Sequence, residues 1–344
     1  MSEPMTKNRV EEISLEYQNY IEQPPVSTEQ LFRQSTSSDA TTIKHWKDTW
    51  IKNIKANHAT HGPFAKNSLG QLFGKYQGQA CILAGSGPSL GYNGHLLKDR
   101  EGIPLISCLH NFHFFEDLEI DVDFYVSLDS GDITVSEVSE GGKKTEEEYW
   151  ALTEKRTLLC YTGTSPKLLE KWRGKVLFFS CSLPDEEITK AQDELEVFNM
   201  CISNGGNVLG ACLYISKAIL GCVTTAFVGA DFSFSYKKKF HAWDSSYDAK
   251  LGNVLKAVDV FGNKVLTWPS YYNFKCWFDC IVQNVPGSYF NCTEGGIFGA
   301  YAEGNLMNLR QMKLGDFLIM NNMNIKQIKA QCEDPTTNRW LLFG

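Results

Sequence analysis

The strongest constraint on the fold is residues 79–90, which read Gln-Ala-Cys-Ile-Leu-Ala-Gly-Ser-Gly-Pro-Ser-Leu. The apolar run at residues 80–84 predicts a buried strand, and residues 88–90 favour the start of a helix. The glycines in residues 85–87 permit a tight turn with close backbone approach, and the free N–H groups of a helix start attract anions such as phosphate. The stretch therefore predicts a nucleotide-handling site, with a plain strand-to-helix connection as the alternative.

An alternation of apolar strands and helical segments follows this stretch. The runs expected to form strands lie at residues 80–84, 104–109, 124–128, 158–161, 176–179 and 224–228. A long apolar helix is expected at residues 207–220, before the last strand. Strands separated by helices indicate a parallel sheet with helices on both faces. The predicted fold is therefore α/β, a Rossmann-like, doubly wound and mostly parallel sheet with a helical N-terminal extension and a C-terminal lid region.

The chain divides by composition into a core and less regular flanks. We expect, in order, a polar N-terminal extension, a helical lead-in, a nucleotide-binding core, an aromatic lid with closing elements and a tail, at residues 1–42, 43–78, 79–232, 233–320 and 321–344. A Ser/Thr-rich run at residues 35–42 is typical of a loose linker, and residues 43–56 have the spacing of an amphipathic helix. The charged residues 137–148 indicate a solvated loop or a helix start. A closing helix is expected near residues 305–319.

Composition narrows the class of protein. With 344 residues, of which 43% are hydrophobic and 21% charged, the chain is typical of a globular protein with a sizeable core. A net charge of −7 argues against a general nucleic-acid coat, which needs clustered lysine and arginine.

The cysteines and the apolar windows bear on the compartment. Eleven cysteines scattered through apolar segments are typical of buried thiols in a reducing environment, so we expect a cytoplasmic protein. Cys276 and Cys280 stand four apart, but no second pair at zinc spacing accompanies them in the sequence. The N-terminal residues lack the apolar core of a signal peptide, and the most apolar window, residues 218–230, is too short to span a bilayer. We expect a soluble protein with no membrane span.

Two common nucleotide-binding motifs do not fit the sequence. A dinucleotide fingerprint would place a third glycine at position 90, which is Leu90, and an acidic residue in the region of residues 108–111, where none stands. The Gly-Lys-Ser/Thr sequence of a P-loop is also missing. NAD, FAD and P-loop kinase chemistry are therefore disfavoured.

Residues suited to a site follow four of the expected strands, namely Gly85, Asn111, Asp129 and Asp231. Because ligands of parallel sheets bind beyond the carboxyl ends of the strands, these positions predict a common site. The amide of Asn111 suits a base or a ribose, or caps the next helix. The carboxylate of Asp129 suits either of two roles, holding a metal beside phosphates or removing the proton of a hydroxyl group. Alternatively, Asp129 belongs to a turn. Asp231 is placed to contact the acceptor.

The region after Asp231 is aromatic and polar, which is typical of a lid on the substrate side. His241 lies there and is our choice of general base or phosphate partner, a solvated surface histidine being the alternative. The lysines at residues 237–239 either neutralise phosphate charge or form a solvated loop. Glu294, beside two glycines, is either catalytic or part of a turn.

Two further clusters have both a functional and a structural interpretation. Residues 203–207, Ser-Asn-Gly-Gly-Asn, precede the long helix and are a second candidate cradle for an anion or a sugar, or a plain N-cap. His110 and His113 stand three apart, which suits a metal, but their aromatic neighbours favour packing.

Several motifs together resemble the MptE-like domain family. They are Gly-Ser-Gly-Pro-Ser-Leu at residues 85–90, Cys-Leu-His-Asn-Phe-His-Phe-Phe-Glu at 108–116, and the block at 205–232 that ends Val-Gly-Ala-Asp-Phe. The family includes the motility accessory factors, whose Asn-x-Thr-Glu-Gly-Gly turn is similar to residues 291–296. The same motifs resemble bacterial sialyltransferases that use CMP-sialic acid, and a Tyr-containing motif of those enzymes is similar to residues 240–244. The resemblance covers residues 46–317.

The resemblance implies a Rossmann-like core that binds a nucleotide and transfers a group from it. The preferred reaction moves a nonulosonic, sialic-acid-like sugar from a CMP-activated donor to a hydroxyl-bearing acceptor. The alternative moves diphosphate from ATP, with Mg²⁺, to a hydroxymethylpterin-type alcohol. A third possibility is a non-catalytic nucleotide-sugar-binding module. The catalytic histidine of the sialyltransferases has no match near Thr267, whereas the Glu-Gly-Gly turn favours the glycosyltransferase branch.

The predicted site has three parts and no metal ligand. Catalytic residues are expected at His241 and Asp129. Nucleotide contacts are expected from Gly85, Ser86, Gly87, Pro88, Ser89, Asn111, Asn204, Gly205, Gly206 and Asn207. Substrate contacts are expected from Asp231, Lys238, Trp243 and Glu294.

Overall fold

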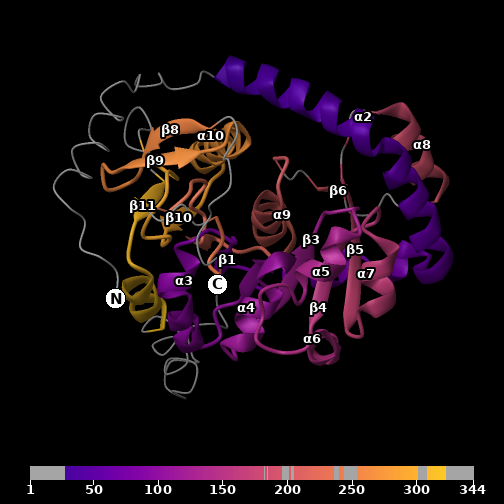
Figure 1. The fold of residues 1–344 in the computed structure, drawn as a ribbon, viewed down its shortest axis with the longest axis horizontal. Coiled ribbons are helices and arrows are strands. Elements are labelled where there is room, and N and C mark those ends of the chain that lie inside the picture. The colour runs from indigo at the N-terminus through magenta and orange to yellow at the C-terminus, as the bar shows by residue number, and fades with distance from the viewer. Residues whose placement is uncertain are drawn as a thin grey trace, which may run out of the picture.

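A parallel sheet with flanking helices forms the centre of the molecule (Figure 1). The computed structural model describes the backbone of residues 28–181, 183, 185–195, 201–202, 205–235, 240–243, 254–300 and 308–322, and the side chains from residue 41 onward. Within these residues the sheet has nine strands in the order β11-β10-β7-β1-β2-β3-β4-β5-β6. The expected α/β, doubly wound fold is confirmed.

The strands of the sheet pair in parallel throughout the described residues. They are β1 (Ala80–Ala84), β2 (Leu105–Cys108), β3 (Phe124–Ser127), β4 (Thr157–Tyr161), β5 (Lys175–Cys181), β6 (Cys201–Ile202), β7 (Thr224–Val228), β10 (Ser288–Asn291) and β11 (Leu309–Gln311). Their continuous apolar runs are buried because helices cover both faces of such a sheet. The six strands expected from the sequence are confirmed to within one or two residues. A separate antiparallel pair joins β8 (Leu255–Val258) to β9 (Lys264–Thr267).

The helices between the strands are mostly short. The α-helices are α2 (Thr28–His61), α3 (Leu90–Asn93), α4 (Phe112–Asp117), α5 (Ile133–Glu137), α6 (Glu146–Leu152), α7 (Pro166–Lys171), α8 (Glu186–Glu194), α9 (Val208–Tyr214) and α10 (Pro269–Asn284). Tighter or wider turns are η1 (Phe64–Asn67), η2 (Leu69–Leu72), η3 (Gly94–Asp99), η4 (Leu109–Asn111), η5 (Thr153–Lys155) and the π-helical η6 (Ile215–Ile219). Residues 314–322 are also helical. Local chemistry sets several of these boundaries: Thr145 and Glu148 form a capping box before α6, and a proline opens α7 and α10.

The strand order reverses next to β1. The chain runs outward from β1 through β2 to β6, and then returns to the other side of β1, where β7 pairs with it from Ala80–Thr224 to Ala84–Val228. A crevice forms at such a reversal beyond the carboxyl ends of the two strands, and ligands of doubly wound folds bind there. The fold therefore directs attention to the loops that follow β1 and β7.

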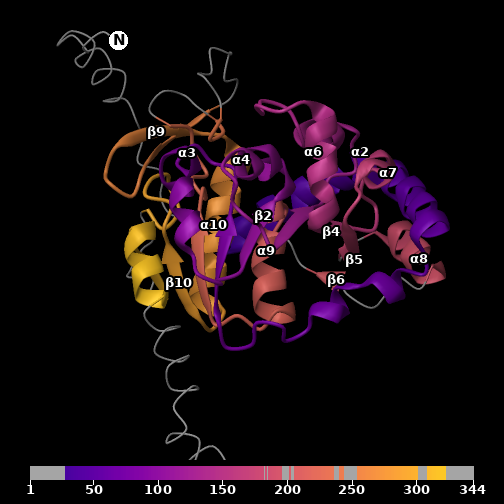
Figure 2. The same cartoon turned by 90° about the horizontal axis from the view of Figure 1, so that it is seen from below.

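Helix α2 is the largest departure from the sequence-based expectation. It packs against α7, α8 and α10 along one side of the molecule (Figure 1; Figure 2). The loose linker expected over residues 35–42 is wrong, because α2 runs through it and crosses the boundary drawn at residue 42. Once a helix is nucleated, adding a residue costs little, so serines and threonines of weak propensity continue it.

Smaller differences lie at other element boundaries. The helix expected at residues 207–220 is divided between α9 and the π-turn η6. Of the closing helix expected near residues 305–319, the structure shows strand β11 first and helix only from residue 314. The expected loop or helix start at residues 137–148 contains the end of α5 and the capped start of α6.

In the described part of the chain, no helix combines the length and the apolar character that crossing a membrane requires. The cysteines in that part are free thiols, and all of them except Cys201 and Cys280 are buried, as the sequence predicts.

Candidate functional site

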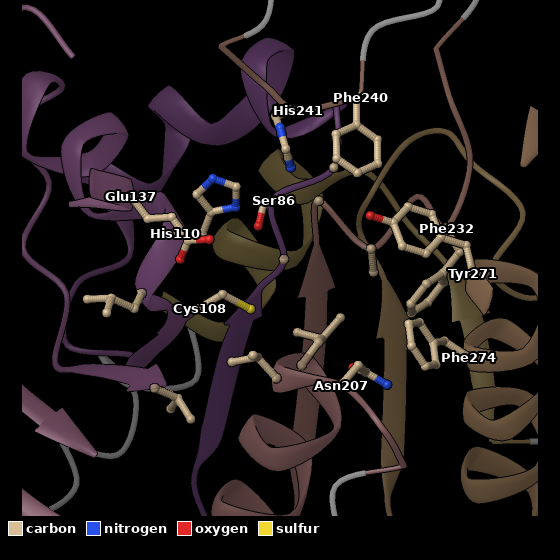
Figure 3. Close-up of a pocket in the computed structure, with 18 of the residues that line it drawn as sticks. Ser86, Cys108, His110, Glu137, Asn207, Phe232, Phe240, His241, Tyr271 and Phe274 are labelled. Atoms are coloured by element: carbon tan, nitrogen blue, oxygen red, sulfur yellow. The ribbon is translucent and has the colours of Figure 1, made fainter. Parts of the chain in front are cut away.

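A pocket of about 400 Å³ opens at the reversal of the strand order, beyond the ends of β1 and β7 (Figure 3). Loops that follow β1, β2, β3 and β7 line it together with the first turn of α9 and one face of α10. A concave site of this size suits a small-molecule ligand. Four strand ends and two helices that are distant in sequence thus converge on one cavity.

The glycine turn (residues 85–89) forms the floor between the two sides of the pocket. A Cβ atom on Gly85 would lie 2.5 Å from the carbonyl oxygen of Gly229, and one on Gly87 would overlap the carboxylate of Asp231. The N–H of Gly85 donates to Val228 O and the N–H of Gly87 to Gly229 O, both at 2.9 Å. The glycines are therefore required by the loop after β7, which packs directly on the turn.

Asp231 and Ser89 close the contact between these loops. The Ser89 hydroxyl donates to Asp231 Oδ2 at 2.7 Å, and the Ser89 N–H donates to Oδ1 at 3.2 Å. Asp231 is only 4% exposed, and its burial raises the pKa of its carboxyl to about 7. The carboxyl group of Asp231 thus binds the start of α3, where the sequence predicted a ligand phosphate. Neither Asp231 nor Ser89 lines the pocket.

Asn111 supports the glycine turn from behind. Its side chain is fully buried, and Nδ2 donates to Gly85 O at 3.0 Å, to Ala84 O at 3.3 Å and to Ser107 Oγ at 3.0 Å. Its Oδ1 atom has no hydrogen-bond partner among the described residues. The structure therefore places Asn111 as a brace for the turn, outside the lining of the pocket.

Two carboxyl groups stand on one wall of the pocket. Asp129 follows β3, and Glu137 ends the short helix α5 that comes next in the chain. Burial, followed by repulsion from Asp129 and Glu140, raises the pKa of Glu137 to about 7. Asp129 reaches solvent at the mouth, yet its carboxyl is recessed among protein atoms, and this desolvation raises its pKa as well.

Histidines adjoin the carboxyl groups, and His241 also contacts Phe240 on the other side of the pocket, with ring centroids 4.1 Å apart. His110 meets His241 edge to face, with ring centroids 4.5 Å apart, and His241 stacks on Trp243 at 4.9 Å with an interplanar angle of 7°. Burial and repulsion from His241 and His113 lower the pKa of His110 to about 3. The N–H of Ala242 donates to Ser86 O at 3.2 Å, so the segment that carries His241 is attached to the glycine turn.

The opposite wall is aromatic. Phe240 and Tyr271 lie nearly parallel, at 4° and 5.6 Å between ring centroids, and Tyr271 contacts Phe274 at 6.1 Å. Phe232 has a positive φ of 50°, a conformation that a phenylalanine rarely adopts, and its side chain borders the cavity (Figure 3). Flat rings exposed to a cavity suit a planar ligand such as a nucleobase.

Comparison with known proteins assigns the family. Residues 49–237, more than half of the chain, match the family model described as 6-hydroxymethylpterin diphosphokinase MptE-like. The chain belongs to the MptE-like family. The resemblance expected from the sequence motifs is thereby confirmed.

A solved structure is similar to this MptE-like chain in fold. The MAf glycosyltransferase from Magnetospirillum magneticum AMB-1 matches 80% of this chain with a TM-score of 0.52 and 15% sequence identity. The chain spans 42% of the length of that structure, so the likeness concerns the shared fold. A search of curated proteins found no match.

The MptE-like pocket brings together some of the residues predicted from the sequence. Those that line it are Gly85, Ser86, Gly87, Asp129, Asn207 and His241. Asn207 also caps α9, because its Oδ1 accepts from the Gly210 N–H at 2.8 Å. The first turn of α9, including Val208 and Leu209, faces the same cavity.

Other predicted residues of the MptE-like chain lie beside the lining or away from it. Gly206 adjoins Phe274, Gly205 packs against Trp277, and Trp243 lies behind His241. Pro88 belongs to the glycine turn but not to the lining. Glu294 accepts from Asn93 Nδ2 at 3.2 Å and from the Leu314 N–H at 3.0 Å, which ties the start of the last helix to the end of α3. Asn204 and Lys238 lie outside the described residues.

Sequence analysis missed two kinds of contributor. Glu137 was counted with a solvated segment, although its position one short helix after Asp129 was a signal that it returns to the same strand end. Asn53 and Asn57 of α2 brace the site from outside: Asn53 Nδ2 donates to Ser130 O and Gly163 O, both at 3.1 Å, and Asn57 Nδ2 to Thr162 O and Thr164 O, both at 2.9 Å. Nothing in the local pattern of α2 reveals these distant partners.

The donor set limits the metals that the wall suits. Among the described residues, no group of three or more His, Cys, Asp and Glu side chains converges as metal ligands. The described lining offers the carboxyl groups of Asp129 and Glu137 as acidic oxygen donors, and these two alone do not make a metal centre. The pair does not resemble a zinc centre.

Proposed function

We propose that this MptE-like chain is a nucleotide-dependent glycosyltransferase that moves a nonulosonic, sialic-acid-like sugar from a CMP-activated donor to a hydroxyl group. The observation that carries the proposal is the pocket at the strand reversal, which joins an aromatic wall to a wall of carboxyl and imidazole groups. Family membership and the fold of the MAf glycosyltransferase support a transferase in general. The sequence motifs support the CMP-sugar donor.

The two walls suggest how the donor lies. The amides of Gly85, Gly87 and Ser89 already donate to protein acceptors, so the glycine turn offers shape more than hydrogen bonds. The phosphate fits between Ser86 and the first turn of α9, where Asn207 lines the cavity. The cytosine then lies toward the aromatic wall, and the sugar lies toward the wall with Asp129 and Glu137.

Charge favours glycosyl transfer over diphosphoryl transfer. The described lining residues include two carboxyl groups and no lysine or arginine. A CMP-linked nonulosonic sugar carries one phosphodiester charge and one carboxylate charge, whereas ATP carries a triphosphate that needs more extensive neutralisation. The described walls therefore suit the less charged donor better.

Ligand binding and product release test the proposal directly. CMP, CMP-N-acetylneuraminic acid and ATP with Mg²⁺ are titrated by calorimetry, and release of CMP from the nucleotide sugar is followed by chromatography. We expect the two cytidine ligands to bind and CMP to be released. Binding without release would indicate a nucleotide-sugar-binding module, and binding of ATP alone would contradict the CMP donor.

A diphosphokinase is the second candidate, because the matched family model carries that description. The two reactions differ in their need for metal: diphosphoryl transfer from ATP requires Mg²⁺ and releases AMP. Excess EDTA should leave CMP release from the nucleotide sugar unchanged. AMP release that appears with a hydroxymethylpterin and stops with EDTA would instead establish the diphosphokinase.

A further inference from the structure

Carboxyl and imidazole groups border one side of the pocket and the rings of Tyr271 and Phe274 border the other, and the two sides meet where His241 contacts Phe240, with ring centroids 4.1 Å apart (Figure 3). Glu137 and His110 lie on one side of Ser86. Tyr271 and Phe274 lie on the other side. Nucleobases stack on aromatic rings, so the base belongs to the second wall and the transferred sugar meets its acceptor at the first. A group that takes the acceptor proton must therefore come from the wall with Glu137.

Glu137 has the position and surroundings of a tunable carboxyl group. It is the last residue of α5, half-buried, with its side chain on the cavity. The titratable groups on neighbouring elements of the same wall are Asp129, Glu140, His110, His113 and His241. Burial lowers the pKa of both His110 and His113, so these imidazoles are neutral near pH 7 and do not offset the carboxylates.

We propose, on the basis of the glycosyltransferase function above, that Glu137 is the catalytic base. Its carboxylate accepts the proton of the acceptor hydroxyl as that oxygen attacks the anomeric carbon of the donor sugar. The bond from the anomeric carbon to the phosphate oxygen breaks, and its electron pair leaves with the phosphate as CMP. The products are the glycosylated acceptor, CMP and the protonated carboxyl of Glu137, which returns its proton to solvent.

The neighbouring groups are less suited to this role. Asp129 stands closer to solvent and acts on Glu137 through charge, since repulsion between the two favours a proton on Glu137. His241 is stacked face to face on Trp243 and edge to face with His110. Burial and repulsion raise the pKa of Glu137 to about 7, and a base is most effective near its operating pH.

The test follows CMP release from CMP-N-acetylneuraminic acid, with water and with lactose as acceptors, from pH 5 to pH 9. Glu137→Gln should reduce kcat roughly 100-fold or more while changing the affinity for CMP less than about threefold. In the wild-type protein kcat should fall below about pH 7, and this acidic limb should be missing in Glu137→Gln. Sodium formate should restore part of the activity of Glu137→Ala, because the small carboxylate replaces the lost base.

The exposed Glu140 gives a matched control on the loop that follows α5. Glu140→Gln should keep the plateau rate of the wild type and gain nothing from formate, while its acidic limb moves to lower pH because one source of repulsion on Glu137 is removed. If Glu137→Gln retains the wild-type rate and acidic limb, Glu137 is not the base, although the glycosyltransferase function stands. If the wild-type protein binds no cytidine ligand and releases no CMP, the proposed function fails and the role of Glu137 fails with it.

Discussion

At the scale of single residues, repulsion from Asp129 contributes to the raised pKa of Glu137. Repulsion from Asp129 is the second cause, after burial, that raises the pKa of Glu137 to about 7. Asp129→Asn removes that repulsion, so the pKa of Glu137 falls and its base form persists at lower pH. The acidic limb of the rate profile of CMP release should therefore move to lower pH, with the plateau rate kept within about tenfold. A limb that stays in place would show that the two carboxyls do not interact.

Asp231 makes the stability of the protein depend on pH. Its folded-state pKa of about 7 lies above its ordinary value of 3.8, so the neutral acid is favoured by folding. The stability it contributes is complete below pH 3.8 and is lost as the pH rises through about 7. Asp231→Asn keeps a neutral group there and should gain stability over the wild type between pH 5 and pH 8, by up to roughly 4 kcal/mol. Urea unfolding at several pH values measures this difference.

Asp132 provides the control for this measurement. It is exposed, and its bonds to Lys167 and Ser165 lower the pKa of its carboxyl. Asp132→Asn should therefore show no relative gain as the pH rises. A flat difference between Asp231→Asn and the wild type would contradict a buried acid of raised pKa.

The glycine turn shows what a motif reveals at this scale. From the sequence, Gly85 and Gly87 predict a tight turn beside a ligand, and the structure places both on the pocket. The reason for glycine differs from the expectation, because the clashing atoms of a side chain would belong to Gly229 and Asp231. Those partners lie more than a hundred residues further along the chain, so no local pattern reveals that they accept hydrogen bonds from the N–H groups of the turn.

At the scale of elements, helix α2 fixes the loops that carry the acidic wall. Asn57 donates to the carbonyl oxygens of Thr162 and Thr164, and the Thr164 hydroxyl donates to Asp129 O at 2.7 Å. Asn57→Ala leaves two buried carbonyl groups without this donor, so we expect a loss of about 2 kcal/mol in the free energy of unfolding. CMP release should also slow, because Asp129 loses its support.

Urea unfolding and the CMP assay measure both effects, with Lys55→Ala as the control. Lys55 is exposed on the same helix, so its replacement should change stability by less than about 0.5 kcal/mol. Equal stability of Asn57→Ala and Lys55→Ala would show that α2 does not brace the site.

Elements were predictable where the pattern of side chains is local. The strands β1 and β7 were found at their observed bounds, because buried parallel strands are continuous apolar runs. The linker over residues 35–42 was wrong, because the stability of α2 comes from packing on α7, α8 and α10, which the local composition does not contain. The bracing role of Asn53 and Asn57 could not be predicted for the same reason, because their hydrogen-bond partners are distant in sequence.

At the scale of the whole molecule, the topology unites the site. The positions of Gly85, Asp129 and Asp231 after separate strands predicted one common site, since parallel strands end at one edge of the sheet. The strand order β7-β1-β2-β3 brings these loops to one edge of the sheet, and the pocket lies at the reversal with Gly85 and Asp129 in its lining. The order of strands does not show which side chains face the cavity, so the sequence did not single out Glu137, which lines the pocket, and named Asp231, which lies outside the lining.

A ligand in this pocket contacts both halves of the sheet and should therefore stabilise the whole fold. By mass action, CMP at a hundred times its Kd should add roughly 2.7 kcal/mol to the free energy of unfolding and raise Tm.

Phe274 of the aromatic wall should provide part of this gain through contact with the base, so Phe274→Ala should weaken CMP binding about tenfold. Phe73, which is 73% exposed and lies outside the lining, is the matched control, and Phe73→Ala should bind CMP as the wild type does. Thermal unfolding with and without CMP measures all three proteins. If CMP shifts the Tm of Phe274→Ala as much as that of the wild type, the nucleobase does not bind at the aromatic wall.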